Sequence, residues 1–468
     1  MIVFTCSVRV FMEKFDVLVI GAGSGLIVAA SALVNGLKTA LVESGPIGGT
    51  CVNRGCVPSK ILIYPADVAS VIYEAEKLGI RATIDKIEFD RIMKRMHKLV
   101  AEDVERQTRA VEEDHRIRWF KGKAEFVSDY TLKTGEEVVK ADKIFIVSGA
   151  RPDVPQLKGI KDVSFLTSDT VLSLEMLPKS MVVIGGGYVG AEYGHFFSSL
   201  GTKVTIIQRN SRILPDEEPE ISQLLAEEMG KRVEIFTDYE AVEVMEKGST
   251  KTVVARSRAS GQVKEFSGEA ILLAAGRVPN SDVLKPERTG VELDKMGFVR
   301  VNEFLETRKK NIFAFGDAIG KQMFKHVANY EAQVAWHNSG HDHKVKVDYR
   351  AAPHAVFTHP QVASVGMKEA EASQSGYKIL VGRAFYKDTA QGAAMAETGS
   401  FVKVIVEQKT GRILGAHIIG PFASVLIQEI INAMASGDGT FVPIFRGLHI
   451  HPSMTEVVQN AFSSLKQP

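Results

Sequence analysis

Two glycine-rich loops, each between an apolar strand-like run and a helix-like segment, constrain the fold of this chain more than any other feature. They lie in FDVLVIGAGSGL (15–26) and MVVIGGGYVG (181–190). A second strand-like run follows each, KTALVES at 38–44 and KVTIIQ at 203–208. Strand, glycine loop, helix and second strand form the βαβ unit that binds dinucleotides, because the glycines let a pyrophosphate approach the helix N-terminus. The repeat predicts an α/β chain with two Rossmann-like dinucleotide-binding domains.

The first loop departs slightly from the glycine pattern. Gly21 and Gly23 stand where the tight turn and the pyrophosphate exclude a side chain. Leu26 occupies the third glycine position, and Gly25 lies one residue earlier. Glu43 ends the second strand, where a carboxylate can accept hydrogen bonds from the ribose hydroxyls. We therefore expect a dinucleotide site here, and a simple strand-to-helix turn is the alternative.

The second loop is complete and contains all three glycines of the pattern: Gly185, Gly187 and Gly190. Gln208 ends the following strand in place of a carboxylate, and Arg209 and Arg212 come next. A guanidinium group pairs with a 2′-phosphate, so this arrangement favours NADPH over NADH. A solvated run of surface charges is the alternative. Two dinucleotide sites in one chain indicate two cofactors that exchange electrons, with FAD in the first domain as the carrier.

Length, charge and cysteine content narrow the class of protein. A chain of 468 residues is long enough for two to four domains. The formal net charge of +1 indicates neither a nucleic-acid partner nor an anionic membrane surface, and no apolar run approaches the ~20 residues that span a bilayer. Three cysteines are typical of a cytoplasmic enzyme rather than a disulfide-stabilised secreted protein. Cys6, in an N-terminal extension of unknown purpose, is expected to be an incidental thiol.

The remaining segments predict how the domains are divided. Residues 61–118 are rich in charge and in helix formers, and IFAFGDAIG (312–320) begins a return segment. From about residue 350, strand-like stretches alternate with a helix near SVLIQEIINAMASG, which indicates an α+β domain. We therefore predict an FAD-binding domain that is interrupted by a nucleotide-binding domain and followed by an interface domain, with the boundaries 1–157 (FAD, first part), 158–281 (NAD(P)), 282–349 (FAD, return) and 350–468 (dimerisation).

Cys51 and Cys56 lie in GGTCVNRGCVPSK (48–60). A metal site needs further cysteine or histidine ligands at regular spacing, and none lies nearby, so no metal is expected. Two separate buried thiols remain an alternative to a redox pair. CVPSKILI predicts a helix that begins at Cys56, where the positive helix end favours a thiolate. If the two cysteines lie on successive helical turns, a disulfide between them would close a short loop.

These motifs together resemble the flavin-dependent pyridine nucleotide-disulfide oxidoreductases, the group of dihydrolipoyl dehydrogenase, glutathione reductase, mycothione reductase and mercuric reductase. The likeness runs through nearly the whole chain in family order. It includes the GAGSG loop and the CVNRGC segment, and its further motifs are IVSGARP (146–152), GGGYVGAE (185–192), AAGRVPN (274–280), FGDAIG (315–320), VFTHPQVASVG (356–366) and HIHPSMTE (449–456).

The resemblance implies roles for individual residues. Cys51 would be the interchange thiol that attacks a substrate disulfide, and Cys56 would face the flavin as the charge-transfer thiolate. Lys60 would lie near flavin N5, paired with Glu192. Tyr188 would gate the nicotinamide pocket. The other residues expected to bind FAD are Gly49, Thr50, Ala124, Gly149, Asp317, Met323, His326 and Ala328, and those expected to bind NADP include Val189 and Gly276.

Thiol–disulfide exchange also needs a group that moves protons, and histidine does so near neutral pH. His451, followed by Pro452 and then by Glu456, resembles the HP…E pattern of the family, while His449 is expected to be a structural partner. Glu456 would hold the imidazole in one tautomer. The resemblance also implies a homodimer in which His451 acts on the cysteines of the partner subunit, and a role in cell redox homeostasis.

The substrate follows less directly from the sequence. FKHVANYEAQVAWHN (324–338), residues 386–406 and HPSMTEVVQNAF (451–462) resemble mycothione reductases, and no C-terminal cysteine pair resembles that of mercuric reductases. We therefore expect an NAD(P)H:disulfide oxidoreductase acting on a small disulfide of the mycothione type. A dihydrolipoyl dehydrogenase that reduces NAD is the main alternative. A flavin-only transhydrogenase, quinone reductase or oxidase is the second, and a non-enzymatic nucleotide-binding or redox-sensing module is the most remote.

Overall fold

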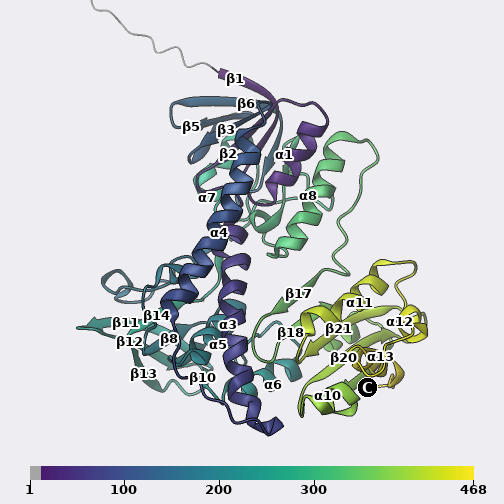
Figure 1. Cartoon of the computed structure of the whole chain (residues 1–468). Helices are drawn as coiled ribbons and strands as arrows, with labels where there is room; N and C mark the ends of the chain where they lie inside the picture. The colour runs from purple at the N-terminus through teal and green to yellow at the C-terminus, as the bar shows by residue number, and fades with distance from the viewer. Residues whose placement is uncertain (1–11) are drawn as a thin grey trace, which may run out of the picture. The chain divides into compact units, whose positions relative to one another are not determined.

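The computed structural model describes residues 12–468 (Figure 1), so the expectation for Cys6 lies outside the described residues. The chain forms two compact units, each assembled from three separate segments. The first unit contains residues up to Ser59 together with Arg95–Pro152 and Arg277–Val347. The second contains Lys60–Lys94, Asp153–Gly276 and Asp348–Pro468. After the second glycine loop, the chain thus returns to the first unit with the segment Arg277–Val347.

The first unit is built on a seven-stranded sheet in the order β3-β2-β1-β6-β5-β4, and β16 also pairs with β6. Its strands are β1 (Met12–Ile20), β2 (Thr39–Glu43), β3 (Ile117–Lys121), β4 (Ala124–Ser128), β5 (Thr131–Thr134), β6 (Glu137–Ile146) and β16 (Ile312–Ala314). Strands β3, β2, β1, β6 and β16 pair in parallel. The helices are α1 (Gly25–Val34), α2 (Gly49–Arg54), α7 (Ser281–Leu284) and α8 (Lys325–Gly340), and β7 (Ala150–Pro152) and β15 (Arg277–Pro279) form a two-stranded ladder.

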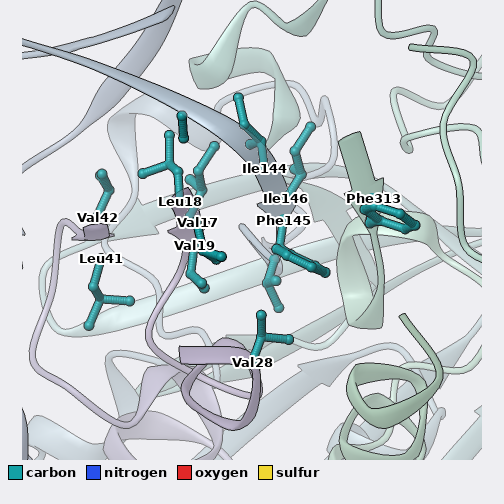
Figure 2. Close-up of a cluster of buried hydrophobic side chains, with 14 of the residues drawn as sticks. Val17, Leu18, Val19, Val28, Leu41, Val42, Ile144, Phe145, Ile146 and Phe313 are labelled. Carbon is teal, nitrogen blue, oxygen red and sulfur yellow. The ribbon is translucent and has the colours of Figure 1, made fainter. Parts of the chain in front are cut away.

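The core of this unit lies around its central parallel strands (Figure 2). Val17, Leu18 and Val19 of β1 are all fully buried, so consecutive residues on both faces of the strand avoid water. A parallel strand covered on both faces selects such a continuous apolar run instead of an alternating pattern. Phe145 of β6 stacks on Phe313 of β16 with the ring centroids 5.3 Å apart. The apolar run FDVLVI is therefore a central strand of the sheet, and the first glycine loop follows its carboxyl end.

The second unit contains the second nucleotide motif and the C-terminal sheet. A four-stranded parallel sheet has the order β10-β9-β8-β14, a meander joins β11, β12 and β13, and an antiparallel sheet has the order β17-β18-β21-β20-β19. The strands are β8 (Ser180–Ile184), β9 (Lys203–Gln208), β10 (Val233–Thr237), β11 (Tyr239–Lys247), β12 (Thr250–Ser257), β13 (Val263–Gly268), β14 (Ala270–Leu273), β17 (Pro353–Val356), β18 (Val362–Gly366), β19 (Ile379–Phe385), β20 (Phe401–Glu407) and β21 (Ile413–Ile419). The helices are α5 (Tyr188–Ser199), α6 (Pro219–Met229), α9 (Glu369–Gln374), α10 (Ala390–Ala394), α11 (Ala423–Ala435), α12 (Val442–Arg446) and α13 (Glu456–Ser463).

Two long helices fill most of the region predicted to be helical between 61 and 118. They are α3 (Cys56–Glu74) and α4 (Phe89–Glu112), and the prediction was wrong for the last residues because β3 begins at Ile117. The helical stretch Gly49–Leu78 is also long and apolar enough to cross a membrane, which the sequence analysis did not anticipate. Core helices of soluble proteins reach the same length and hydropathy. In this stretch Lys60 forms an ion pair with Glu192 at 2.7 Å, and Asp67 forms a hydrogen bond with His195 at 2.8 Å.

The fold class is the predicted one, with two Rossmann-like dinucleotide-binding parts and a C-terminal α+β part. Residues 60–94, expected as an insertion in the first domain, group with the second unit. The four-segment domain division itself stays a prediction.

Candidate active site

The first glycine loop joins β1 to α1 and leaves little room for side chains. A Cβ atom on Gly49 would lie 2.6 Å from the Cα atom of Gly23, and Gly49 has a φ of +62°. Position 49 therefore requires glycine, whereas a Cβ atom on Gly23 would make only an ordinary contact of 3.8 Å with the Gly49 Cα atom. The buried Ser148 hydroxyl, close to Gly21, has no hydrogen-bond partner among the described residues. A bare backbone surface with an unsatisfied buried hydroxyl beside it fits the pyrophosphate half of a dinucleotide.

The two nucleotide motifs share one contact between the end of the second strand and the glycine loop, and a different side chain makes it in each. In the first, Glu43 Oε2 accepts a hydrogen bond from the backbone N–H of Ala22 at 2.8 Å. In the second, Gln208 Oε1 accepts one from the N–H of Gly186 at 3.5 Å, and Gln208 Nε2 donates to the Arg212 carbonyl at 3.2 Å. The same contact is thus made by a carboxylate in one motif and by an amide in the other. Of these two side chains, only Glu43 carries the negative charge that accepts hydrogen bonds from free ribose hydroxyls.

The second loop is open where a phosphate would approach. A Cβ atom on Gly187 would have no neighbour within 4 Å, whereas one on Gly190 would collide with the Gly185 carbonyl oxygen. Gly187 precedes α5, so its open side faces the positive end of that helix. Glycine at position 190 allows the helix to pack closely on the loop. Glycine at position 187 leaves space through which a phosphate group can approach the backbone.

Three arginines gather beyond the end of β9. Arg209 and Arg212 are exposed, so an anionic ligand can reach both side chains. Arg258 Nη1, also on an exposed side chain, donates to the Arg209 carbonyl at 3.3 Å. Arg258 lies beyond β12, and the sequence offered no motif by which to identify it. Asp238 lies beside these arginines, because its N–H donates to the Asn210 carbonyl at 3.0 Å and its carbonyl accepts from the Arg258 N–H at 2.7 Å, while β9 itself ends on the neutral Gln208.

Cys51 and Cys56 are present as thiols in two helices rather than on successive turns of one helix. Cys51 lies in α2 and Cys56 begins α3, so the predicted helix start at Cys56 is confirmed. Gly55 joins the helices, and a Cβ atom there would lie 3.2 Å from the Cα atom of Cys51. This tight junction turns Cys56 toward Cys51. Their mutual hydrogen bond and burial raise the pKa of the Cys51 thiol.

Lys325 is a cation near the cysteine pair that the sequence analysis missed. It is the first residue of α8, and its Nζ atom donates to Ser24 Oγ, beside the first glycine loop, at 3.2 Å. Burial lowers the pKa of the Lys325 ammonium group, and thiolate charge on Cys51 and Cys56 opposes that shift. The lysine therefore lies close enough to favour thiolates electrostatically. It belongs to the FKHVAN stretch, but no spacing rule connects it to residues 51–56.

The predicted pair of Lys60 and Glu192 is present. Lys60 Nζ donates to both carboxylate oxygens of Glu192 at 2.7 Å, and the ammonium group also lies 4.5 Å from the ring centroid of Phe357. The backbone N–H of Phe357 donates to Glu192 Oε1 at 3.0 Å. Glu192 is 9% exposed, so its carboxylate is held in a fixed position, while the Lys60 side chain is one-third exposed.

The predicted pair of His451 and Glu456 is also present. Glu456 Oε1 contacts His451 Nδ1 at 2.8 Å, and Oε2 accepts from the N–H of Ser453 at 3.0 Å. These hydrogen bonds, that with His451 first, hold the pKa of Glu456 below its usual value. His451 is exposed, whereas His449 is half-buried and bonded to Glu429 at 3.1 Å; their active and structural roles stay predictions.

The other residues predicted to bind FAD lie in the first unit, as do Cys51 and Cys56; only Lys60 falls in the second. Asp317, on the turn after β16, lies 3.6 Å from Arg277 Nε, and burial raises the pKa of its carboxyl group. Met323 and His326 are exposed near the start of α8, and the His326 ring stacks on Phe324. Thr50 lies in α2, Ala124 begins β4, Gly149 precedes β7, and Ala328 is buried in α8. Val189 lies in α5, and Gly276 ends the nucleotide segment.

Family models match most of the chain. The model described as pyridine nucleotide-disulphide oxidoreductase matches residues 15–333, and the dimerisation-domain model of the same name matches 352–462. The chain belongs to the pyridine nucleotide-disulphide oxidoreductase family. It is 36% identical to mycothione reductase of Mycobacterium tuberculosis, over 97% of this chain and 100% of that protein. It is 34% identical to dihydrolipoyl dehydrogenase of Chlamydia pneumoniae, over 95% of both chains.

Solved structures of the family have the same fold. The HOCl-induced flavoprotein disulfide reductase RclA from Escherichia coli, in its Cu(II) complex, superimposes with a TM-score of 0.86 at 27% identity, over 97% of this chain and 99% of that one. Membership makes this protein a flavoprotein that uses FAD and a pyridine nucleotide as an NAD(P)H:disulfide oxidoreductase. Within residues 12–468, no group of three or more histidine, cysteine, aspartate or glutamate side chains could hold a metal ion.

Proposed function

We propose that this protein uses NADPH to reduce a small disulfide of the mycothione type, through Cys51 and Cys56. The overall reaction converts one disulfide, one NADPH and one proton into two thiols and NADP. The preference for NADPH rests on one observation above others: Gln208 makes the contact that the carboxylate of Glu43 makes in the first motif. Arg209 and Arg212 follow this neutral strand end in the chain, and the Arg258 guanidinium donates to the Arg209 carbonyl, so three exposed cationic side chains are available for a 2′-phosphate.

Bound FAD would supply a two-electron carrier between the reduced nicotinamide and the Cys51–Cys56 disulfide. We assign its pyrophosphate to the Gly21–Gly25 loop, its adenosine ribose to Glu43 and its ribityl chain to Asp317, with the other predicted FAD residues around it. The raised pKa of Asp317 suits a carboxyl group that shares hydrogen bonds with hydroxyls. Lys60, fixed by Glu192, supplies a positive charge at the flavin ring.

The cysteines then perform two exchanges. The Cys51 thiolate attacks one sulfur of the substrate, the substrate S–S bond breaks, and the first product leaves as a thiolate that takes a proton from His451. The Cys56 thiolate attacks Cys51 in the mixed disulfide, which forms the Cys51–Cys56 disulfide and expels the second product as a thiolate that takes the second proton from solvent. Glu456 keeps His451 oriented and supports its charged form. Lys325 favours the thiolate form of the pair.

A homodimer completes this site in our proposal, with His451 of one subunit serving the cysteines of the other. The matched dimerisation domain supports it. So does a set of exposed apolar side chains in the same part of the chain: Phe422, Val425, Phe445, Leu448 and Ile450. Exposed apolar side chains gathered in one part of a chain are typical of a surface that another subunit covers.

The mycothione-type substrate is supported by the 36% identity to a mycothione reductase across both whole chains. A dihydrolipoyl dehydrogenase is the second candidate, because a relative of that name is 34% identical over 95% of this chain. Gln208 and the neighbouring arginines disfavour it, since that reaction uses NAD. A flavin-only transhydrogenase or quinone reductase would not need Cys51 and Cys56 to lie together.

The test begins with the flavin-loaded protein under anaerobic conditions. We expect one equivalent of NADPH to produce a long-wavelength thiolate–flavin absorption band, and NADH to do so at least about tenfold more slowly. Mycothione, glutathione disulfide and lipoamide are then added separately, and mycothione is expected to bleach the band fastest. Cys56→Ser should lack the band. A wild-type protein without the band would refute the redox pair, and faster reduction by NADH would refute the cofactor assignment.

A further inference from the structure

Tyr188 is held by contacts that no motif predicted. It is the first residue of α5, directly after Gly187, and therefore stands at the mouth of the second glycine loop. Its hydroxyl donates to Glu217 Oε1 at 3.2 Å. Its ring also stacks on the imidazole of His354, with the centroids 5.5 Å apart and the planes 27° apart. A side chain at the entrance to a nucleotide loop is thus fixed at both its ring and its hydroxyl.

Glu217 and His354 are bonded to each other as well. His354 Nε2 lies 2.5 Å from Glu217 Oε1, the same oxygen that receives the Tyr188 hydroxyl. Glu217 Oε2 accepts from Ser364 Oγ at 2.6 Å, and Ser364 Oγ contacts His417 Nδ1 at 3.0 Å. The carboxylate is 2% exposed and has three polar partners, so a buried hydrogen-bonded network determines its position.

The charge state of Glu217 agrees with this arrangement. Burial opposes ionisation, but the hydrogen bonds from His354 and Ser364 prevail and lower the pKa of the Glu217 carboxyl group. Burial and the neighbouring Glu217 carboxylate raise the pKa of Tyr188, so its hydroxyl stays protonated and acts as the donor. Both groups keep their roles throughout the neutral range.

The segment that carries His354 also reaches the other proposed catalytic groups. His354 lies in β17, and three residues later the N–H of Phe357 donates to Glu192, the partner of Lys60. One short segment of the C-terminal part therefore touches both Tyr188 and the Lys60–Glu192 pair. Such a segment can set the position of both without contacting a ligand.

We propose that His354 and Glu217 form a clamp that positions Tyr188 for the nicotinamide end of the bound nucleotide. This inference rests on the proposed function, and it makes His354 and Glu217 positioning residues rather than catalytic ones. An aromatic side chain that is already fixed loses less freedom when a ligand packs on it, which strengthens binding. Loss of the clamp should therefore weaken binding of the nicotinamide portion and leave the adenosine portion unaffected.

The test measures equilibrium binding by calorimetry on the flavin-loaded dimer. His354→Phe retains an aromatic ring for stacking and removes the hydrogen bond to Glu217, and we expect the Kd for NADP to rise about two- to tenfold. The Kd for 2′,5′-ADP, which lacks the nicotinamide, should not change. His359→Phe is the matched control, because His359 Nε2 contacts Glu74 at 2.8 Å in the connection between β17 and β18, away from Tyr188. It should leave both Kd values as in the wild type.

Tyr188→Phe separates a positioning role from general loosening of the fold. It removes the hydroxyl through which the clamp acts, so His354→Phe should change the Kd for NADP by less than about 1.5-fold on this background. An unchanged Kd in the single His354→Phe variant, an equal rise for 2′,5′-ADP, or an equal effect with and without the Tyr188 hydroxyl would each overturn the clamp. Failure of the wild type to bind either ligand would refute the NADPH proposal instead.

Discussion

Glu43 and Gln208 occupy the same place in two copies of one motif, and the difference between them is a single functional group. Each side-chain oxygen accepts a hydrogen bond from the middle residue of its glycine loop. Conversion of acid to amide keeps this contact and removes one negative charge. At the residue scale, cofactor choice therefore depends on what lies beside the amide, and Arg209 is its direct neighbour.

Arg209→Ala is expected to lower kcat/KM for NADPH about 10- to 100-fold, because a hydrogen bond between charged groups contributes roughly 1.5–3 kcal/mol. The value for NADH should change little, since NADH has no 2′-phosphate. Steady-state kinetics with both nucleotides would measure this. Equal losses for both would mean that Arg209 acts on the fold instead of on the phosphate.

The two glycines that flank Tyr188 and Val189 should respond differently to alanine. Gly187→Ala meets no atom within 4 Å, so the thermal midpoint should stay near that of the wild type while nucleotide binding weakens at least about tenfold. Gly190→Ala collides with the Gly185 carbonyl and should destabilise the protein by roughly 1–3 kcal/mol. Calorimetric unfolding and NADP titration of both variants would separate these outcomes. A stable Gly190→Ala protein would contradict the packing role.

At the scale of elements, patterns local in sequence were predictable and contacts distant in sequence were not. The continuous apolar runs identified β1 and β8, the glycines after them identified both loops, and the helix start at Cys56 followed from local residues. Strand β19 was missed because GYKILVGRAF has a glycine and an arginine within the run. Glu217 and Lys325 were missed for a different reason. Nothing in their local sequence indicates that they lie beside Tyr188 and the cysteine pair.

The end of α3 is joined to the connection between β17 and β18 by Glu74 and His359. Hydrogen bonding with His359 lowers the pKa of Glu74 to about 2, from a model-compound value near 4.5. A carboxylate with a depressed folded pKa stabilises the fold above its unfolded pKa, and this contribution disappears as the pH falls toward the folded pKa.

Glu74→Gln should therefore be less stable than the wild type at pH 6, and the difference should shrink between about pH 4.5 and pH 2. Urea unfolding at a series of pH values would measure it. The matched variant Glu76→Gln changes an exposed carboxylate in the neighbouring turn and should show no such convergence. A constant difference across this range would show that the pair does not act through the charge of Glu74.

At the scale of the whole molecule, the proposed site belongs to two subunits. Cys51→Ser and His451→Gln should each lower disulfide reduction at least about a hundredfold as homodimers. Heterodimers of the two variants would contain one intact site if His451 acts across the interface. Co-expression in equal amounts should then restore about a quarter of the wild-type specific activity, since half of the dimers are mixed and each has one working site.

Co-expression of Cys51→Ser with Cys56→Ser is the control, because each subunit then carries a damaged cysteine pair and no combination yields an intact site. Recovery in the first mixture and none in the second would assign the histidine to the partner. The absence of recovery in both, with dimer mass verified by light scattering, would place His451 and its cysteines in one subunit.

The contact between Gly23 and Gly49 limits how segments of this chain can be exchanged with those of a relative. The two residues belong to different motifs, one for the nucleotide and one for the thiols, yet a methyl group on Gly49 would meet the backbone of Gly23 at 2.6 Å. The motifs are therefore not independent modules. A chimera that takes residues 45–60 from a relative must therefore carry glycine at position 49, because the Cα atom of any residue at position 23 would meet a side chain there.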